Sequence, residues 1–367
     1  MKITKLTFWQ CDLQSHEAYY MAEGKTCDVV PSIIMRLDTD AGISGWGEVC
    51  PIPHYLPAYP DGIIPGINYL APVLIGADAS HPEVVMARAN AYLIGHPYVK
   101  SIIDMALHDA AARAAGLPLY QYLGGNFGQP MPLYHSITCI APDEMARIAV
   151  EEKAKGMTQF QVKLGADKNN EADIARLRLV REAVGAGPLV YGDWNCGATS
   201  LDAIRVGRGV SDIDIMLEQP CQTIAECAKV RHATGVPMKL DENAHDIASL
   251  IEGHQAGCMD AAALKISKFG GVSEMRKARD ICLKLGIKMC IEDTWGSDIT
   301  TSAALHIGAS TNPKFIMNVC DLSSYVSPKL DDSLPVRQDG HIVAPSGHGL
   351  GVTPDPDKLG TQLAVIS

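Results

Sequence analysis

Short apolar runs alternate with amphipathic stretches along the chain from about residue 131 onward. The stretch 171–185 is typical of a helix, since Ile174, Leu177 and Val180 recur at the spacing of one helix face. Strands that each run into a helix predict parallel pairing with crossover connections, and eight such units close a barrel. The apolar runs expected to be barrel strands are 132–137, 159–164, 188–193, 213–218, 236–241, 261–266, 287–292 and 314–319.

The first third of the chain has another pattern, which predicts strands followed by helices. Residues 2–11 and 27–39 alternate enough to be strands, and the polar segment 13–26 between them is expected to be a loop. Helical patterns follow at about 82–95 and 100–115. The glycine-containing end of the chain is expected to be a loop-rich tail.

Composition is that of an ordinary globular protein, with 47% hydrophobic and 20% charged residues. A net charge of -11 repels polyanions, which argues against a nucleic-acid partner. We find neither an apolar run of roughly 18 residues nor a leader-like start, so we expect no membrane span and no signal peptide. The 11 cysteines are scattered, which indicates reduced thiols in a cytoplasmic protein rather than a zinc site.

Three consecutive predicted strands end in a carboxylate, at Asp193, Glu218 and Asp241. In such a barrel the carboxyl ends of the strands meet at one rim, so these acids would repel one another in a low dielectric. A hard divalent cation removes the repulsion, and ligation by oxygen alone suits Mg²⁺. Each acid alone would more simply cap the following helix. Three in succession favour the metal.

Two lysines lie at strand ends on either side of the acids, Lys163 on the second predicted strand and Lys265 on the sixth. In a ring of eight strands these positions are opposed. One interpretation is a pair of salt bridges to the acids. The other is a pair of bases, whose pKa values burial and a nearby cation lower toward about 7–8. The metal would then hold a substrate carboxylate and the negative charge that develops when the α-proton leaves.

Further motifs match these residues to a known family. They are the helix 103–109 with its continuation to Gly125, the strand 45–48, the Phe269-Gly270-Gly271 turn, and the tail 347–351. The chain resembles the enolase superfamily, and within it the muconate lactonizing enzyme subgroup, over nearly its whole length. The resemblance assigns the metal ligands to Asp193, Glu218 and Asp241 and the bases to Lys163 and Lys265.

The resemblance also implies a fold and a domain organisation. The expected fold is a (β/α)7β-type modified TIM barrel with an α+β capping domain. We expect the capping domain at 1–128, the barrel with its catalytic site at 129–345, and a tail at 346–367 that packs back on the capping domain. The expected partners are a small carboxylate substrate and further copies of the chain in a homo-oligomer.

One position departs from the family pattern. The family has Lys-x-Lys on the second strand, and here the first lysine is replaced by Gln161. A neighbouring lysine lowers the pKa of the catalytic one by like-charge repulsion, so Lys163 would rely on Mg²⁺ and burial instead. Gln161 is then expected to hydrogen-bond the substrate.

The substrate is less well specified by the sequence. Glu292, Asp293 and Trp295 at the seventh strand suit a cationic amine, although helix capping and loop packing explain them equally well. Asn195 is a further expected substrate contact. The eighth strand lacks the Asp-x-Asp that dipeptide epimerases of the family use, which argues against a dipeptide.

The loops resemble the branch of the family that handles proline derivatives, above all the cis-3-hydroxy-L-proline dehydratases of amino-acid catabolism. This implies Mg-dependent dehydration to Δ1-pyrroline-2-carboxylate, with 2-epimerisation as a side reaction. Two alternatives stay open. One is an epimerase or racemase of proline betaines or N-acyl amino acids, and the other is a barrel that binds a metabolite without catalysis.

Overall fold

The computed structural model describes residues 1–128 and 130–367. Position 129, at which the barrel domain is predicted to begin, lies outside the described residues. Within them, eight parallel strands form one sheet in the order β12-β11-β10-β9-β8-β7-β6-β5. A parallel bridge between Leu133 and Val319 joins its two edges, so the sheet curls around on itself. The predicted fold class is confirmed.

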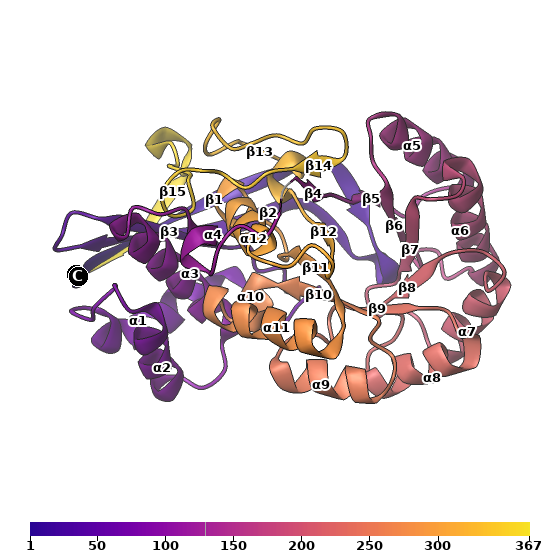
Figure 1. The fold of residues 1–367 in the computed structure, drawn as a ribbon, viewed down its shortest axis with the longest axis horizontal. Coiled ribbons are helices and arrows are strands. Elements are labelled where there is room, and N and C mark those ends of the chain that lie inside the picture. The colour runs from indigo at the N-terminus through magenta and orange to yellow at the C-terminus, as the bar shows by residue number, and fades with distance from the viewer. Residues whose placement is uncertain (129) are drawn as a thin grey trace.

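The sheet strands are β5 (His135–Ile137), β6 (Gln159–Lys163), β7 (Leu189–Asp193), β8 (Met216–Glu218), β9 (Met238–Leu240), β10 (Ala261–Lys265), β11 (Lys288–Glu292) and β12 (Ile316–Val319). The helices between them are α5 (Pro142–Ala154), α6 (Asn170–Val184), α7 (Ser200–Gly209), α8 (Ile224–Thr234), α9 (Ile247–Gln255), α10 (Ile266–Phe269), α11 (Val272–Leu285) and α12 (Asp298–Ala309). Helices α5 to α9 form an arc around the strands (Figure 1).

The first part of the chain forms a second sheet with helices packed on it. Its strand order is β13-β1-β2-β3, and β15 pairs with β1. The strands are β1 (Ile3–Tyr20), β2 (Thr26–Thr39), β3 (Ser44–Val49), β13 (Val326–Ser327) and β15 (Thr361–Ile366). The helices are α1 (Ile63–Leu74), α2 (Pro82–Tyr92), α3 (Pro97–Ala114) and α4 (Leu119–Tyr122), while β4 (Met131–Pro132) and β14 (His341–Ile342) pair separately. Helices α1 to α3 lie at the end of the molecule away from α5 to α8 (Figure 1).

The predicted loop 13–26 is wrong over most of its length. Strand β1 runs on to Tyr20 and pairs antiparallel with β2 up to Thr26. Leu13 and Ser15 are buried between exposed polar neighbours, which is the two-residue period of a strand with one solvent-exposed face, and Tyr19 is buried further along. The segment was taken for a loop because most of its residues are polar. The tail also contains a strand that was not predicted, since β15 pairs with β1.

Strand β3 lies directly against helix α3. A Cβ on Gly45 would lie 2.0 Å from the Ala106 carbonyl oxygen, and one on Gly47 would lie 2.0 Å from that of Ile102. Only glycine permits this approach. The contact sets where Glu48, the next residue of β3, meets the barrel.

Buried carboxylates of the first domain bind the amino ends of two barrel helices. Glu48 accepts hydrogen bonds from the backbone N–H groups of Ser297, at 2.9 Å, and Thr300, at 2.9 Å, where α12 begins. Asp104 of α3 accepts from the Ser273 N–H, at 2.7 Å, at the start of α11. Helix amino ends carry unpaired N–H groups and partial positive charge. Each acid therefore accepts hydrogen bonds from those N–H groups and balances that charge.

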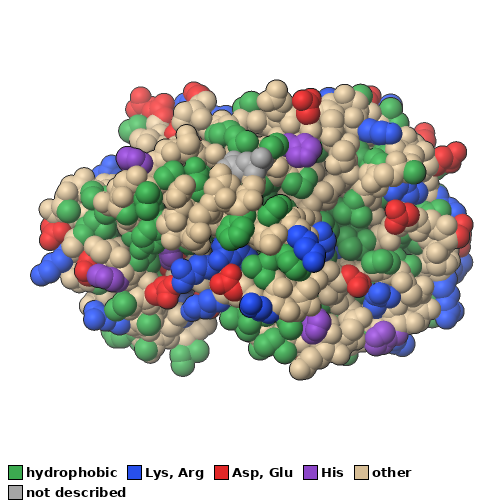
Figure 2. All heavy atoms as spheres, in the orientation of Figure 1, with side chains coloured by type: hydrophobic (Ala, Val, Ile, Leu, Met, Phe, Trp, Pro, Cys, Tyr) green, Lys and Arg blue, Asp and Glu red, His purple; other side chains and the backbone are tan. Residues whose placement is uncertain are grey.

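The surface adds little to the functional argument. On the face drawn in Figure 2, acidic and basic side chains are interspersed over most of the molecule. None of the helices in the described residues combines the length and the apolar character needed to cross a bilayer.

Candidate active site

Strand pairing brings the predicted residues into one row at the carboxyl ends of β6 to β9. Lys163 lies opposite Asp193, Asp193 opposite Glu218, and Glu218 opposite Lys239. Asp241 follows β9 directly. The acids are almost completely buried. Three carboxylates and two lysines are therefore held together out of contact with bulk water.

Lys163 contacts the first acid of the row. Its Nζ lies 2.5 Å from Asp193 Oδ2 and 3.1 Å from Asn195 Oδ1. Desolvation lowers the pKa of Lys163, but the Asp193 and Glu218 carboxylates outweigh it and raise the pKa above its ordinary value.

Lys265 contacts the last acid. Its Nζ lies 2.6 Å from Asp241 Oδ2 and donates a hydrogen bond to the Tyr55 hydroxyl, which itself donates to Asp241 Oδ2 at 2.9 Å. A second amine, Lys268 Nζ, lies 2.9 Å from Asp241 Oδ1. Desolvation lowers the pKa of Lys265, but Asp241 and Glu292 raise it well above its ordinary value.

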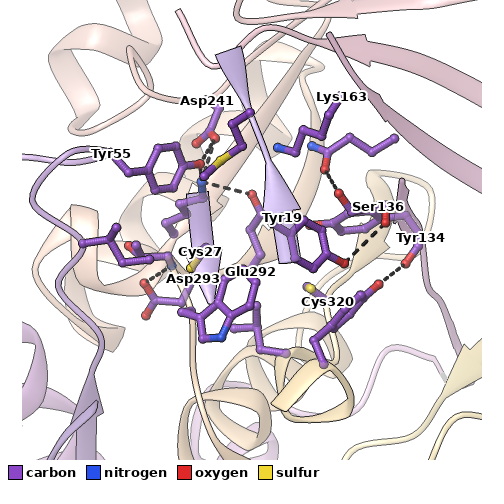
Figure 3. Close-up of a pocket in the computed structure, with 18 residues that line it drawn as sticks. Tyr19, Cys27, Tyr55, Tyr134, Ser136, Lys163, Asp241, Glu292, Asp293 and Cys320 are labelled. Atoms are coloured by element: carbon purple, nitrogen blue, oxygen red, sulfur yellow. Dashed lines mark hydrogen bonds and ion pairs between the residues drawn. The ribbon is translucent and has the colours of Figure 1, made fainter. Parts of the chain in front are cut away.

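Both amines are ion-paired to buried acids, and this pairing raises their pKa values. The predicted lowering applies to amines beside a bound cation and stays a prediction. The two lysines were predicted to lie on opposite sides of the cavity. Figure 3 shows Lys163 across the cavity from Asp241 and Tyr55, which are the residues that Lys265 contacts.

Gln161 is fixed by three hydrogen bonds at the centre of the row. Its Nε2 donates to Glu218 Oε2 at 2.8 Å and to Asp193 Oδ2 at 3.1 Å, and its Oε1 accepts from Ser136 Oγ at 2.7 Å. The amide therefore donates to both acids without adding a charge.

Glu218 has a partner that the strand-end pattern did not identify. Lys239, fully buried on β9, places Nζ 2.8 Å from Glu218 Oε1 and 4.3 Å from the centroid of the Tyr191 ring. The contact lies outside hydrogen-bond geometry, so Oε1 remains without a donor. Desolvation is the main reason that the pKa of Glu218 is raised to about 8. Lys239 lies two residues before Asp241, and this strand period was the signal that could have found it.

These residues fit a bound divalent cation. The candidate metal ligands are carboxylate oxygens at the ends of successive strands, and Glu218 Oε1 accepts no hydrogen bond. Gln161 Nε2 donates to both Asp193 and Glu218, which shows that those two side chains lie close together. As placed, no three acidic, histidine or cysteine side chains of 1–128 and 130–367 converge as metal ligands do. Lys265 and Lys268 hold Asp241 toward their own amines.

The remaining predicted contacts differ in their placement. Asn195 binds Lys163 and Glu242 Oε1, the latter at 3.2 Å, so it supports the row instead of lining the cavity. Asp293 lines the cavity, but the Thr294 N–H and the Ser267 hydroxyl occupy its oxygens at 2.7 Å each.

Trp295 lines the cavity and lies edge-on to Tyr19, with ring centroids 5.5 Å apart. Tyr19, Cys27 and Tyr55 of the first domain complete the wall, together with Tyr134 and Cys320 of the barrel. Sequence reasoning missed these residues. Tyr19 lies in the segment taken for a loop, and a residue such as Tyr55 carries no local pattern that places it beside Lys265.

Comparison with known families assigns both parts of the chain. Residues 9–124 match the family model described as mandelate racemase/muconate lactonizing enzyme, N-terminal domain. Residues 144–358 match the model described as enolase C-terminal domain-like.

Two curated relatives are enzymes. Cis-3-hydroxy-L-proline dehydratase of Roseibium aggregatum is 38% identical, with 100% of each chain covered. N-succinyl-L-Arg/Lys racemase of Bacillus cereus is 28% identical, with 84% of this chain and 85% of the relative covered.

Two crystal structures of proteins from Roseovarius nubinhibens are similar over 98% or more of each chain. A mandelate racemase/muconate lactonizing enzyme superposes with a TM-score of 0.94 at 32% identity. A member of the enolase superfamily complexed with magnesium superposes with a TM-score of 0.92 at 34% identity.

Proposed function

We infer, from the premise that this chain belongs to the mandelate racemase and muconate lactonizing enzymes of the enolase superfamily, that it is a magnesium-dependent dehydratase of cis-3-hydroxy-L-proline. The chain is an enzyme of that superfamily. The metal and the substrate are our proposal, and they are supported by the row of buried acids between two lysines and by the similarity to a dehydratase over the full length.

Asp193, Glu218 and Asp241 would hold the ion. When bound, Mg²⁺ supplies the positive charge that balances these acids, attracts the substrate carboxylate and stabilises negative charge beside it. The chain itself then leaves two amines free on opposite sides of the cavity, at Lys163 Nζ and Lys265 Nζ.

The two amines match the stereochemistry of the proposed substrate. In cis-3-hydroxy-L-proline the hydroxyl group lies on the ring face opposite the α-hydrogen. One lysine, as the neutral amine, takes the α-proton. The other, as the ammonium, gives a proton to the departing hydroxyl, so that water leaves as the Cα–Cβ double bond forms. The enamine tautomerises to Δ1-pyrroline-2-carboxylate.

The buried surroundings assist both transfers. The cavity wall of Tyr19, Tyr55, Tyr134 and Trp295 keeps water from the reacting carbon. Lys268 remains beside Asp241 as a third amine, which leaves Lys265 free to act on the substrate. The observation that carries the proposal is the placement of Lys163 and Lys265 at opposed strand ends with the acids between them.

The test is incubation of the Mg²⁺-loaded enzyme with cis-3-hydroxy-L-proline in D₂O. We expect the cyclic imine as product, and we expect Lys163→Ala and Lys265→Ala each to lower kcat by a factor of about 10² to 10⁴. Absence of both the imine and deuterium at C2 would refute the proposal.

A second candidate uses the same residues. The similarity to a racemase and the opposed amines favour 2-epimerisation, in which the proton returns on the other face. Deuterium exchange at the α-carbon of a proline betaine or an N-acyl amino acid, without elimination, would favour this reaction. A barrel that merely binds a metabolite would bind equally well in both lysine variants and show no exchange.

A further inference from the structure

Glu292 ends strand β11 beside Lys265 and on the side away from the acids. The register of β10 and β11 places Glu292 opposite Lys265. In the order of the strands, β11 is four positions from β7 in either direction around the ring, so Glu292 faces the Asp193 side of the cavity. A substrate whose carboxylate lies at the acid row therefore extends its other groups toward Glu292.

One oxygen of Glu292 is occupied and the other is not. Oε2 accepts a hydrogen bond from the Tyr134 hydroxyl at 2.5 Å. Oε1 lies 3.8 Å from Lys265 Nζ, which is too long for a hydrogen bond, and it receives none from the described residues. The side chain is 5% exposed and lines the cavity, as Figure 3 shows. A carboxylate oxygen buried in this way can accept a donor from a ligand.

The other carboxylates on this side already accept a hydrogen bond at each oxygen. Both oxygens of Asp293 are taken by Ser267 and Thr294. Asp321 accepts two hydrogen bonds from Arg337, at 2.7 Å and 2.8 Å. Among the described residues of this half, Glu292 is thus the carboxylate with an oxygen that no protein donor contacts, and that oxygen can bind a positive group on the substrate.

The walls beside Glu292 are aromatic. Tyr19, Tyr134, Tyr325 and Trp295 line the cavity there together with Cys320. Such rings pack against a saturated ring and tolerate a nearby positive charge on their faces. The combination of one open carboxylate and aromatic walls suits a cyclic secondary ammonium group.

We propose that Glu292 is the ammonium subsite of the substrate, which restricts the enzyme to cyclic amino acids with a charged nitrogen and excludes N-acylated ones. The proposal rests on the proposed function in one respect, namely that the substrate carboxylate lies at the acid row. Sequence reasoning gave this role to Glu292, Asp293 and Trp295 together, and the proposal assigns it to Glu292.

The test compares two ligands that differ in one ring atom. L-Proline carries the ammonium, and (S)-tetrahydrofuran-2-carboxylate replaces it with a neutral oxygen. Calorimetric titration of the Mg²⁺-loaded wild-type enzyme should show a preference of about tenfold or more for L-proline, because a charge-assisted hydrogen bond is present for that ligand alone.

Glu292→Gln keeps the shape of the side chain and removes its charge. We expect the preference to fall to about twofold or less, with the affinity for tetrahydrofuran-2-carboxylate unchanged. Asp293→Asn, next to it in the chain, should keep the wild-type preference. If Glu292→Gln does not fold, Glu292→Asp provides the measurement, and the shorter side chain should reduce the preference partially.

Two outcomes would overturn the proposal. One is a wild-type enzyme that binds both ligands equally, and the other is a Glu292→Gln variant that loses affinity for both to the same extent. A wild-type enzyme that shows the Glu292-dependent preference but does not dehydrate cis-3-hydroxy-L-proline refutes the proposed function and leaves the subsite standing.

Discussion

Gln161 replaces a lysine with a neutral amide, and its contacts explain how the acid row accepts the change. The amide donates to Asp193 and Glu218 and is itself held by Ser136. Two buried carboxylates therefore keep a donor at the position where the family has a charge. The positive charge beside those two carboxylates comes from Lys163 and Lys239.

We predict that Gln161→Leu destabilises the metal-free enzyme by about 2 kcal/mol, because buried acceptors lose their donor. The loss should shrink in saturating Mg²⁺, since the ion then balances the same carboxylates. Urea unfolding with and without MgCl₂ measures both values, and Gln222→Leu at an exposed position is the control. An equal loss under both conditions would point to packing alone.

His306 is held as one neutral tautomer. Its Nδ1 accepts a hydrogen bond from the Tyr120 N–H at 3.2 Å, so the ring proton lies on Nε2, which donates to the Leu350 carbonyl oxygen at 3.0 Å. Protonation would place an N–H against an N–H. Burial lowers the pKa of His306 from 6.5 to about 4.

Stability should therefore fall in acid through this residue. Between pH 6.5 and 4 the unfolded chain binds a proton that the folded protein does not, so the free energy of unfolding decreases as the pH falls through that window. We expect His306→Gln to remove about 2–3 kcal/mol of this decrease by pH 4.5. Urea unfolding across pH tests it, with exposed His254→Gln expected to follow the wild-type slope. A variant with the wild-type slope would contradict the assignment.

At the scale of single residues, the sequence predicted the side chains that lie at the carboxyl ends of barrel strands. Lys163, Asp193, Glu218 and Lys265 each end a strand. The strand-end pattern did not identify Tyr55 and Lys239, for different reasons. Tyr55 reaches Lys265 from another domain, and Lys239 lies one layer below the rim.

At the scale of elements, the barrel strands were predictable because buried parallel strands are short apolar runs. Two elements of the first domain were not. The second half of β1 is polar on its exposed face, and α1 carries Pro65 near its start and Pro72 within it. In both cases packing against neighbouring elements outweighs the local pattern.

The contact of Glu48 with α12 predicts a large stability effect. We expect Glu48→Ala to cost about 3 kcal/mol, because it leaves the buried N–H groups of Ser297 and Thr300 without an acceptor. Glu83→Ala is the matched control. Its pair with Arg276 is half exposed, so we expect a change within about 0.5 kcal/mol. Urea unfolding measures both, and similar values for the two variants would refute the capping role.

At the scale of the whole molecule, the acid row predicts coupling between metal binding and folding. If Mg²⁺ is held by folded Asp193, Glu218 and Asp241, as proposed, it should stabilise the native state by about 2.7 kcal/mol at one hundred times its Kd. Thermal unfolding should show a higher midpoint with MgCl₂ than with KCl at equal ionic strength. Asp193→Asn should lose the increment, and an unchanged increment would exclude Asp193 as a ligand.

The packing of the two domains could be predicted from the family resemblance but not from the local sequence pattern. Glu48 and Ser297 are separated by 249 positions, and Asp104 and Ser273 by 169. Helix and strand periodicity relates only residues that are close in sequence, so it does not predict such pairs. They follow from the fold as a whole, in which β3 and α3 present both acids to the barrel.

The fastening of the first domain at α11 and α12 has a consequence for turnover. Buried acids of the first domain bind the amino ends of α11 and α12, and this anchoring opposes rotation of the domain as a unit. Tyr55 lies between the two anchoring acids in the chain and bonds Lys265, the amine that would act on the proposed substrate. A substrate that bonds the Lys265 amine would therefore have to replace its hydrogen bond to the Tyr55 hydroxyl.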